Sequence, residues 1–154
     1  AFLLRDDIET IHAATDSLAE AKLSPELRNE ALYYRAKAYT KQKADKKAVD
    51  DLRELAKDTR NAYGAEAKYL VAQSLYDAKE YNAAEKELLN YIEQSTPHAY
   101  WLARSFVLLS DVYAAMGKDL DARQYLLSLQ QNYQGNDDIA TMIESRLSKL
   151  KVKN

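Results

Sequence analysis

The feature that most constrains this chain is the stretch 64–92, which has a degraded copy on either side of it. Small and apolar residues recur at steps of three and four, first over 65–76 and again over 81–92. This spacing predicts two amphipathic helices. Because only a few residues around Lys79 separate them, the two helices are predicted to fold back on each other as a hairpin.

The flanking copies hold the same columns of small residues. These columns are Ala36, Ala72 and Ser110 in the first helix, and Ala48, Ala84 and Ala122 in the second. The offset is 36 residues between the first two copies and 38 between the last two. Bulky residues keep the same register, namely Tyr39, Leu52 and Leu55, then Leu75, Leu88 and Tyr91, then Tyr113, Leu126 and Leu129. Self-similarity at a nearly fixed period is typical of stacked repeats.

The columns predict an all-α fold, an α-α superhelix or solenoid of about three helical hairpins with an extra helix at each end. The predicted segments are a leading helix over 6–22, repeats over 25–60, 62–94 and 97–133, and a capping helix over 137–151. We expect one domain over 1–154. The leading helix resembles the second half of a hairpin, so we expect the chain to be a fragment of a longer protein.

Several short motifs predict where the helices begin and end. Ser24-Pro25 and Thr96-Pro97 each combine a capping hydroxyl with proline, which is typical of a helix start. Gly117 is predicted to end the helix before it. Gly64 is predicted to lie in a connector, where it supplies a backbone angle that other residues resist.

At these columns the chain resembles the tetratricopeptide repeat family, whose pattern has a small and an aromatic residue in the first helix, then an alanine and a bulky apolar residue. The resemblance covers about residues 29–133. It departs in its period, since the family repeats every 34 or so residues, and in the closing proline, replaced by Arg60 and Thr96. Such longer repeats are similar to those of bacterial envelope proteins, such as the TolA-binding periplasmic protein and the lipoprotein of the outer-membrane barrel assembly machine. The resemblance implies an interaction scaffold in the bacterial periplasm or envelope.

Residues for catalysis or metal binding do not gather in the sequence. The two histidines, His12 and His98, lie on separate elements far apart in the sequence, whereas a metal or acid–base role needs convergent partners. There is no cysteine, and the three glycines are isolated, so no phosphate-binding loop is present. The pairs Asp6-Asp7, Asp50-Asp51 and Asp137-Asp138 are expected in first helical turns or on polar faces. We expect no enzymatic activity, no metal and no cofactor.

Charge and hydropathy narrow the class of partner. With 22 basic and 24 acidic residues the formal net charge is -2, which does not favour nucleic acid. No apolar run approaches the roughly 20 residues that cross a bilayer, so direct membrane insertion is not expected. A protein or peptide is the expected partner.

The expected binding surface is the inner, concave face formed by the first helices. Seven inner-face residues are singled out, Tyr33, Lys37, Tyr69, Gln73, Tyr76, Arg104 and Asp111. Mixed aromatic and charged side chains suit a peptide or a helix, although a merely solvated face fits them equally well. Some family members clamp a carboxyl terminus with Lys, Asn and Arg. Those columns here include Leu70 and Leu108, which disfavours that mode.

Two alternatives remain open at this point. A structural spacer or self-association segment of a larger envelope protein would explain Leu3, Leu4, Ile8 and Ile11, whose helix lacks a partner. A glycan-binding surface would explain Tyr100 and other exposed aromatic residues.

Overall fold

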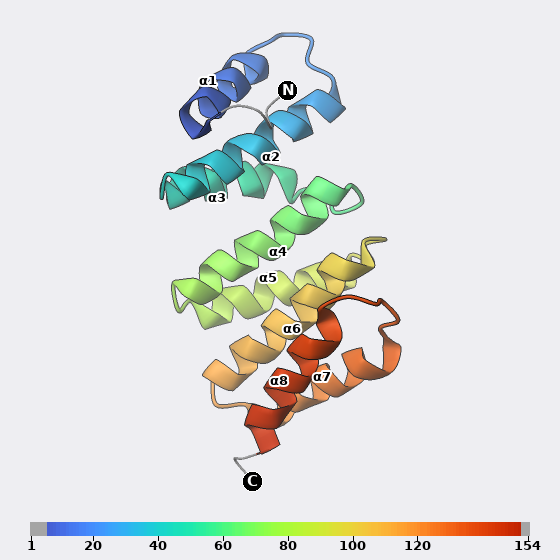
Figure 1. Ribbon diagram of the computed structural model, residues 1–154. Helices are drawn as coiled ribbons and strands as arrows, with labels where there is room; N and C mark the ends of the chain where they lie inside the picture. Colours follow the sequence, from blue (N-terminus) through green and yellow to red (C-terminus); the bar gives the residue numbers. More distant parts are fainter. Residues whose placement is uncertain (1–5, 152–154) are drawn as a thin grey trace. The chain divides into compact units, whose positions relative to one another are not determined.

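The computed structural model describes residues 6–151, and within that range it contains helices and no strands (Figure 1). The helices are α1 (Asp7–Leu18), α2 (Pro25–Lys41), α3 (Asp45–Leu55), α4 (Ala62–Asp77), α5 (Tyr81–Glu93), α6 (Ala99–Ala115), α7 (Asp119–Asn132) and α8 (Ile139–Lys151). The predicted all-α class is confirmed. In the described residues, no helix is long and apolar enough to cross a membrane.

The chain divides into two compact units, Ala1–Val71 and Ala72–Asn154, and the division falls inside α4. In the first unit, α2 packs against α1 and against α3. In the second unit, α6 packs against α5 and α7, and α8 contacts both α6 and α7. All six members of the small-residue columns are at most 3% exposed, so they belong to the core. A small side chain at a helix crossing allows close approach of the two backbones.

The three hairpin turns share one backbone geometry. Lys43, Lys79 and Gly117 have positive φ angles of 58°, 62° and 76°, and they lie 36 and 38 residues apart, as the columns do. In each turn this residue's amide donates to the carbonyl three residues earlier, and the next amide donates to the carbonyl five residues earlier. That pair of bonds is the Schellman ending of a helix. The repeat found in the side chains is therefore present in the backbone too.

Three helix ends differ from their predicted positions. α1 ends at Leu18 and α3 at Leu55, each several residues early. After Leu55 the chain turns tightly, and the Asp58 side chain accepts a hydrogen bond from the Arg60 amide at 3.0 Å. α6 begins after Thr96-Pro97, because the Thr96 hydroxyl accepts from the His98 amide at 3.3 Å and caps a turn that precedes the helix.

Gly64 has a different role from the predicted one. It lies in the first turn of α4, where its amide donates to the Asn61 side chain at 2.9 Å. A Cβ atom at this position would overlap the carbonyl oxygen of Asp58 and would lie 2.7 Å from that of Leu55. Glycine is needed because the start of α4 touches the end of α3, not because of an unusual backbone angle.

Candidate interaction surface

The inner-face residues all lie on the first helices of the three hairpins, α2, α4 and α6. Tyr33, Lys37 and Tyr69 belong to the first unit, and the other four belong to the second. Six of the seven are partly exposed. Tyr69 is only 5% exposed, so its ring is part of the core and is not available to a partner.

In the first unit, Glu66 of α4 joins two inner-face residues of α2. The Tyr33 hydroxyl donates to Glu66 Oε1 at 3.0 Å, and Lys37 Nζ lies 2.7 Å from Glu66 Oε2. Burial, followed by the Glu66 carboxylate, raises the pKa of Tyr33 well above its ordinary value. The helical spacing places Glu66 on the same inner face as Tyr69 and Gln73.

Three tyrosine rings surround this contact, and we call them the tyrosine cluster: Tyr33, Tyr34 and Tyr63. The Tyr33 ring centroid lies 5.2 Å from that of Tyr34, edge to face, and 4.6 Å from that of Tyr63. Lys37 Nζ lies 5.2 Å from the Tyr33 centroid, within the range of a cation–π contact. The first unit thus has an aromatic and charged surface patch.

In the second unit, Asp111 is held by the last helix. Arg146 of α8 donates from Nε to Oδ1 at 2.7 Å and from Nη2 to Oδ2 at 3.0 Å. Burial, followed by Asp111, raises the pKa of Tyr76. α8 therefore covers part of the inner face of α6. The sequence showed α8 only as a cap, and nothing in the spacing of Arg146 marked Asp111 as its partner.

The remaining inner-face residues make short-range contacts. Gln73 Nε2 donates to Asp77 Oδ1 at 2.9 Å within α4. Arg104 Nη1 donates to the Tyr100 hydroxyl at 3.0 Å, and that hydroxyl donates to Asp138 Oδ1 at 3.0 Å. Arg104 also lies 5.8 Å from the centroid of the Trp101 ring. The hydrogen bonds of Arg104 and Tyr100 connect the start of α6 to Asp138, just before α8.

The ionisable groups of the described residues do not form a metal centre, since no group of three or more histidines, aspartates or glutamates is close enough to hold an ion. His12 lies on α1 and His98 immediately before α6. No protein family, curated protein or solved structure matches the chain.

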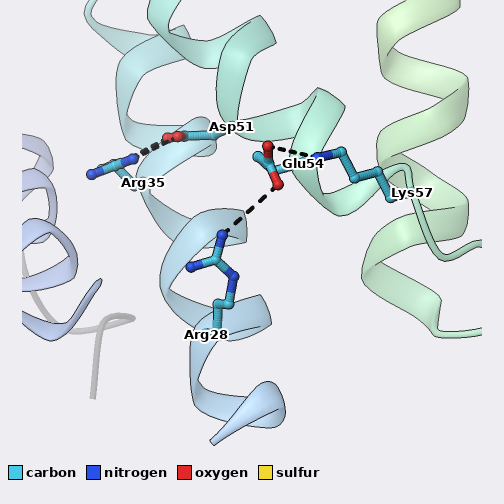
Figure 2. A network of polar contacts seen from close by, with 5 residues as sticks. All are labelled: Arg28, Arg35, Asp51, Glu54 and Lys57. Carbon is cyan, nitrogen blue, oxygen red and sulfur yellow. Dashed lines mark hydrogen bonds and ion pairs between the residues drawn. The ribbon is translucent and has the colours of Figure 1, made fainter. Parts of the chain in front are cut away.

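The pair Asp50-Asp51 corrects the prediction that both carboxylates lie on a polar face. Asp51 is 5% exposed and accepts two hydrogen bonds from Arg35 of α2, at 2.8 Å from Nε and 2.6 Å from Nη2 (Figure 2). Arg35 Nη1 also donates to the Thr15 hydroxyl of α1 at 3.2 Å. The ion pair joins α2 to α3, and the hydrogen bond from the same Arg35 to Thr15 joins α2 to α1, so Arg35 has a structural role.

A second set of charges in the same picture is exposed. Glu54 of α3 lies 3.8 Å from Arg28 and 2.9 Å from Lys57 (Figure 2). The Arg28 and Glu54 side chains are 50% and 45% exposed. Water and salt screen such pairs, so they contribute little to stability.

Proposed function

We propose that the chain is a non-catalytic scaffold that binds a polypeptide through the partly exposed side chains of its first helices. The observation that carries the proposal is the patch on α2 and α4, where Tyr33, Lys37 and Glu66 converge with two more tyrosine rings. Tyrosine supplies large contact area at a low cost in conformational entropy, and charged neighbours add specificity.

The repeat geometry supports the same function. The three turns share one backbone conformation, so equivalent positions on the first helices hold equivalent places in their own hairpins. This agrees with the resemblance to the tetratricopeptide repeat family, and we propose membership of that family on those grounds. On the same resemblance, we also propose that the protein works in the bacterial envelope.

Selection from a phage library of random 12-residue peptides on the full chain tests this function. The affinity of a selected peptide is then measured by fluorescence anisotropy for the wild type, Tyr33→Ala and Tyr63→Ala, whose rings are in contact within the first unit. We expect each substitution to weaken binding by about fivefold or more, because a buried aromatic anchor contributes over 1 kcal/mol or so. Leu120→Ala is the control, since Leu120 is 71% exposed on α7. Unchanged affinity in both tyrosine variants would remove the inner face from the proposal.

Self-association is the second candidate, and Ile8 favours it. Ile8 is 59% exposed on α1, whereas Thr10 and Ala14 are the buried residues of this helix. Leu3 and Leu4 lie outside the described residues. Sedimentation should show a concentration-dependent dimer that Ile8→Glu disperses, and a monomer at every concentration would contradict this candidate.

The glycan-binding surface at Tyr100 stays a prediction.

A further inference from the structure

The tyrosine cluster and Glu30 share one place in the first unit. Glu30, Tyr33, Tyr34 and Lys37 follow each other on α2 at the spacing that places residues on one helical face. Tyr63 joins them from the first turn of α4, with its ring in contact with Tyr33. All three rings and Glu30 are partly exposed, so a ligand can reach them.

The charges around the cluster favour a cation. Aromatic faces carry negative electrostatic potential, and the Lys37 ammonium already lies over the face of Tyr33. Lys37 neutralises Glu66. Burial, then Tyr34 and Glu30, raise the pKa of Tyr63, which is consistent with a Glu30 carboxylate beside that ring. Among the described residues, Lys37 pairs with Glu66 and not with Glu30, so the Glu30 charge can attract a further cation.

The fold itself does not require this cluster. In the third hairpin, the residues equivalent to Tyr33 and Tyr34 are Val107 and Leu108, each 3% exposed. The residue equivalent to Glu30 is Arg104, which reverses the charge. The same hairpin turn therefore forms with aliphatic residues at these positions. The three rings and the carboxylate are a local property of the first unit.

We propose that the tyrosine cluster and Glu30 form a binding site for a cationic side chain of a peptide, with arginine preferred. A guanidinium stacks on a tyrosine ring while its N–H groups bond to a carboxylate, whereas an ammonium makes a point contact. The site rests on the proposed function, since it gives the peptide partner a basic residue at this place. Glu30 supplies the charge and the rings supply the stacking surface.

A titration with two tripeptides tests the site on the full chain. The probes are acetyl-Gly-Arg-Gly-amide and the same peptide with citrulline, which keeps the shape of arginine without its charge. We expect the arginine probe to shift the ring NMR signals of Tyr33, Tyr34 and Tyr63, with a dissociation constant of roughly millimolar size. The citrulline probe should bind at least fivefold more weakly. A lysine probe should fall between the two.

Two charge-matched variants complete the test. Glu30→Gln should reduce binding of the arginine probe to the level of citrulline, and Glu20→Gln, in an exposed position after α1, should leave it unchanged. Equal binding of both probes, or an arginine affinity that Glu30→Gln does not alter, would overturn the site. Phage-selected peptides that lack basic residues yet depend on Tyr33 would overturn it too, while leaving the proposed function intact. If no peptide can be selected although the arginine probe binds, the proposed function would be overturned, while the cation site itself would stand.

Discussion

Lys43 and Lys79 adopt a backbone angle that glycine adopts most easily, and Gly117 occupies the equivalent place in the third turn. A side chain in the left-handed region costs roughly 1–2 kcal/mol, because Cβ approaches the following carbonyl. The Schellman bonds hold both lysines there, since they satisfy carbonyl groups at the helix end. Two of the three turns are therefore strained at one residue.

Replacing Lys79 with glycine should relieve that strain. We expect Lys79→Gly to raise the free energy of unfolding in urea by about 1 kcal/mol. Lys86→Gly, at an exposed position inside α5, should lower it by about the same amount, because glycine disfavours a helix interior. A loss of stability in Lys79→Gly would mean that the positive φ is not present in solution.

The small-residue columns give a second prediction at this scale. Ala84 is fully buried, so Ala84→Leu should overpack the helix crossing and lower the free energy of unfolding by about 1–3 kcal/mol. Ala83→Leu is the matched control at the neighbouring exposed position, and it should change the stability by less than about 0.5 kcal/mol. Equal effects of the two substitutions would show that Ala84 is not at a crossing.

These residues also show what the sequence can and cannot predict. Buried alanines are predictable because they recur in columns. The burial of Asp51 is not, because its partner Arg35 is 16 residues away and the pair has no counterpart in the other columns. The prediction that Tyr69 is available to a partner fails for a related reason. Helical spacing assigns a residue to a face, but it does not show how much of that face neighbouring helices bury.

At the scale of the elements, Arg35 joins α2 to α3 through a largely buried ion pair with Asp51 and to α1 through a hydrogen bond to Thr15. Removing one partner leaves a desolvated charge, so Arg35→Ala should lower the free energy of unfolding in urea by about 3 kcal/mol. Arg28→Ala breaks only the exposed pair with Glu54 and should cost less than about 0.5 kcal/mol.

A double variant separates charge from packing at this pair. Arg35→Met combined with Asp51→Leu should recover most of the lost stability, because apolar side chains of similar volume need no partner. If Arg35→Ala is no worse than Arg28→Ala, the contacts of Arg35 do not stabilise the packing of these helices.

Helix ends were less predictable than helices. The chain leaves α3 early because Asp58 bonds to the Arg60 amide and because Gly64 brings α4 against α3. A sequence shows glycine as a general turn former and gives no reason to place it inside a helix at a contact. The hairpin turns were predictable, since their positions follow from the small-residue columns on both sides.

For the molecule as a whole, the all-helical class and the order of the helices followed from the repeat. The hydrogen bonds and ion pairs that the candidate surface residues make did not follow from it. The pattern assigned Lys37 and Asp111 to one column, but it could not show that Glu66 and Arg146 already hold them. These contacts are made between helices far apart in the sequence, so periodicity within a helix does not report them.

The central claim, that the first helices bind a polypeptide, is tested most directly by the ring NMR signals of assigned tyrosines during titration with a phage-selected peptide. We expect Tyr33, Tyr34 and Tyr63, on α2 and α4 of the first unit, to shift in proportion to binding. Tyr91 of α5, which is fully buried, and Tyr125 of α7 should keep their positions. Shifts at Tyr125 with none at Tyr33, Tyr34 or Tyr63 would place the partner on the second helices and contradict the account.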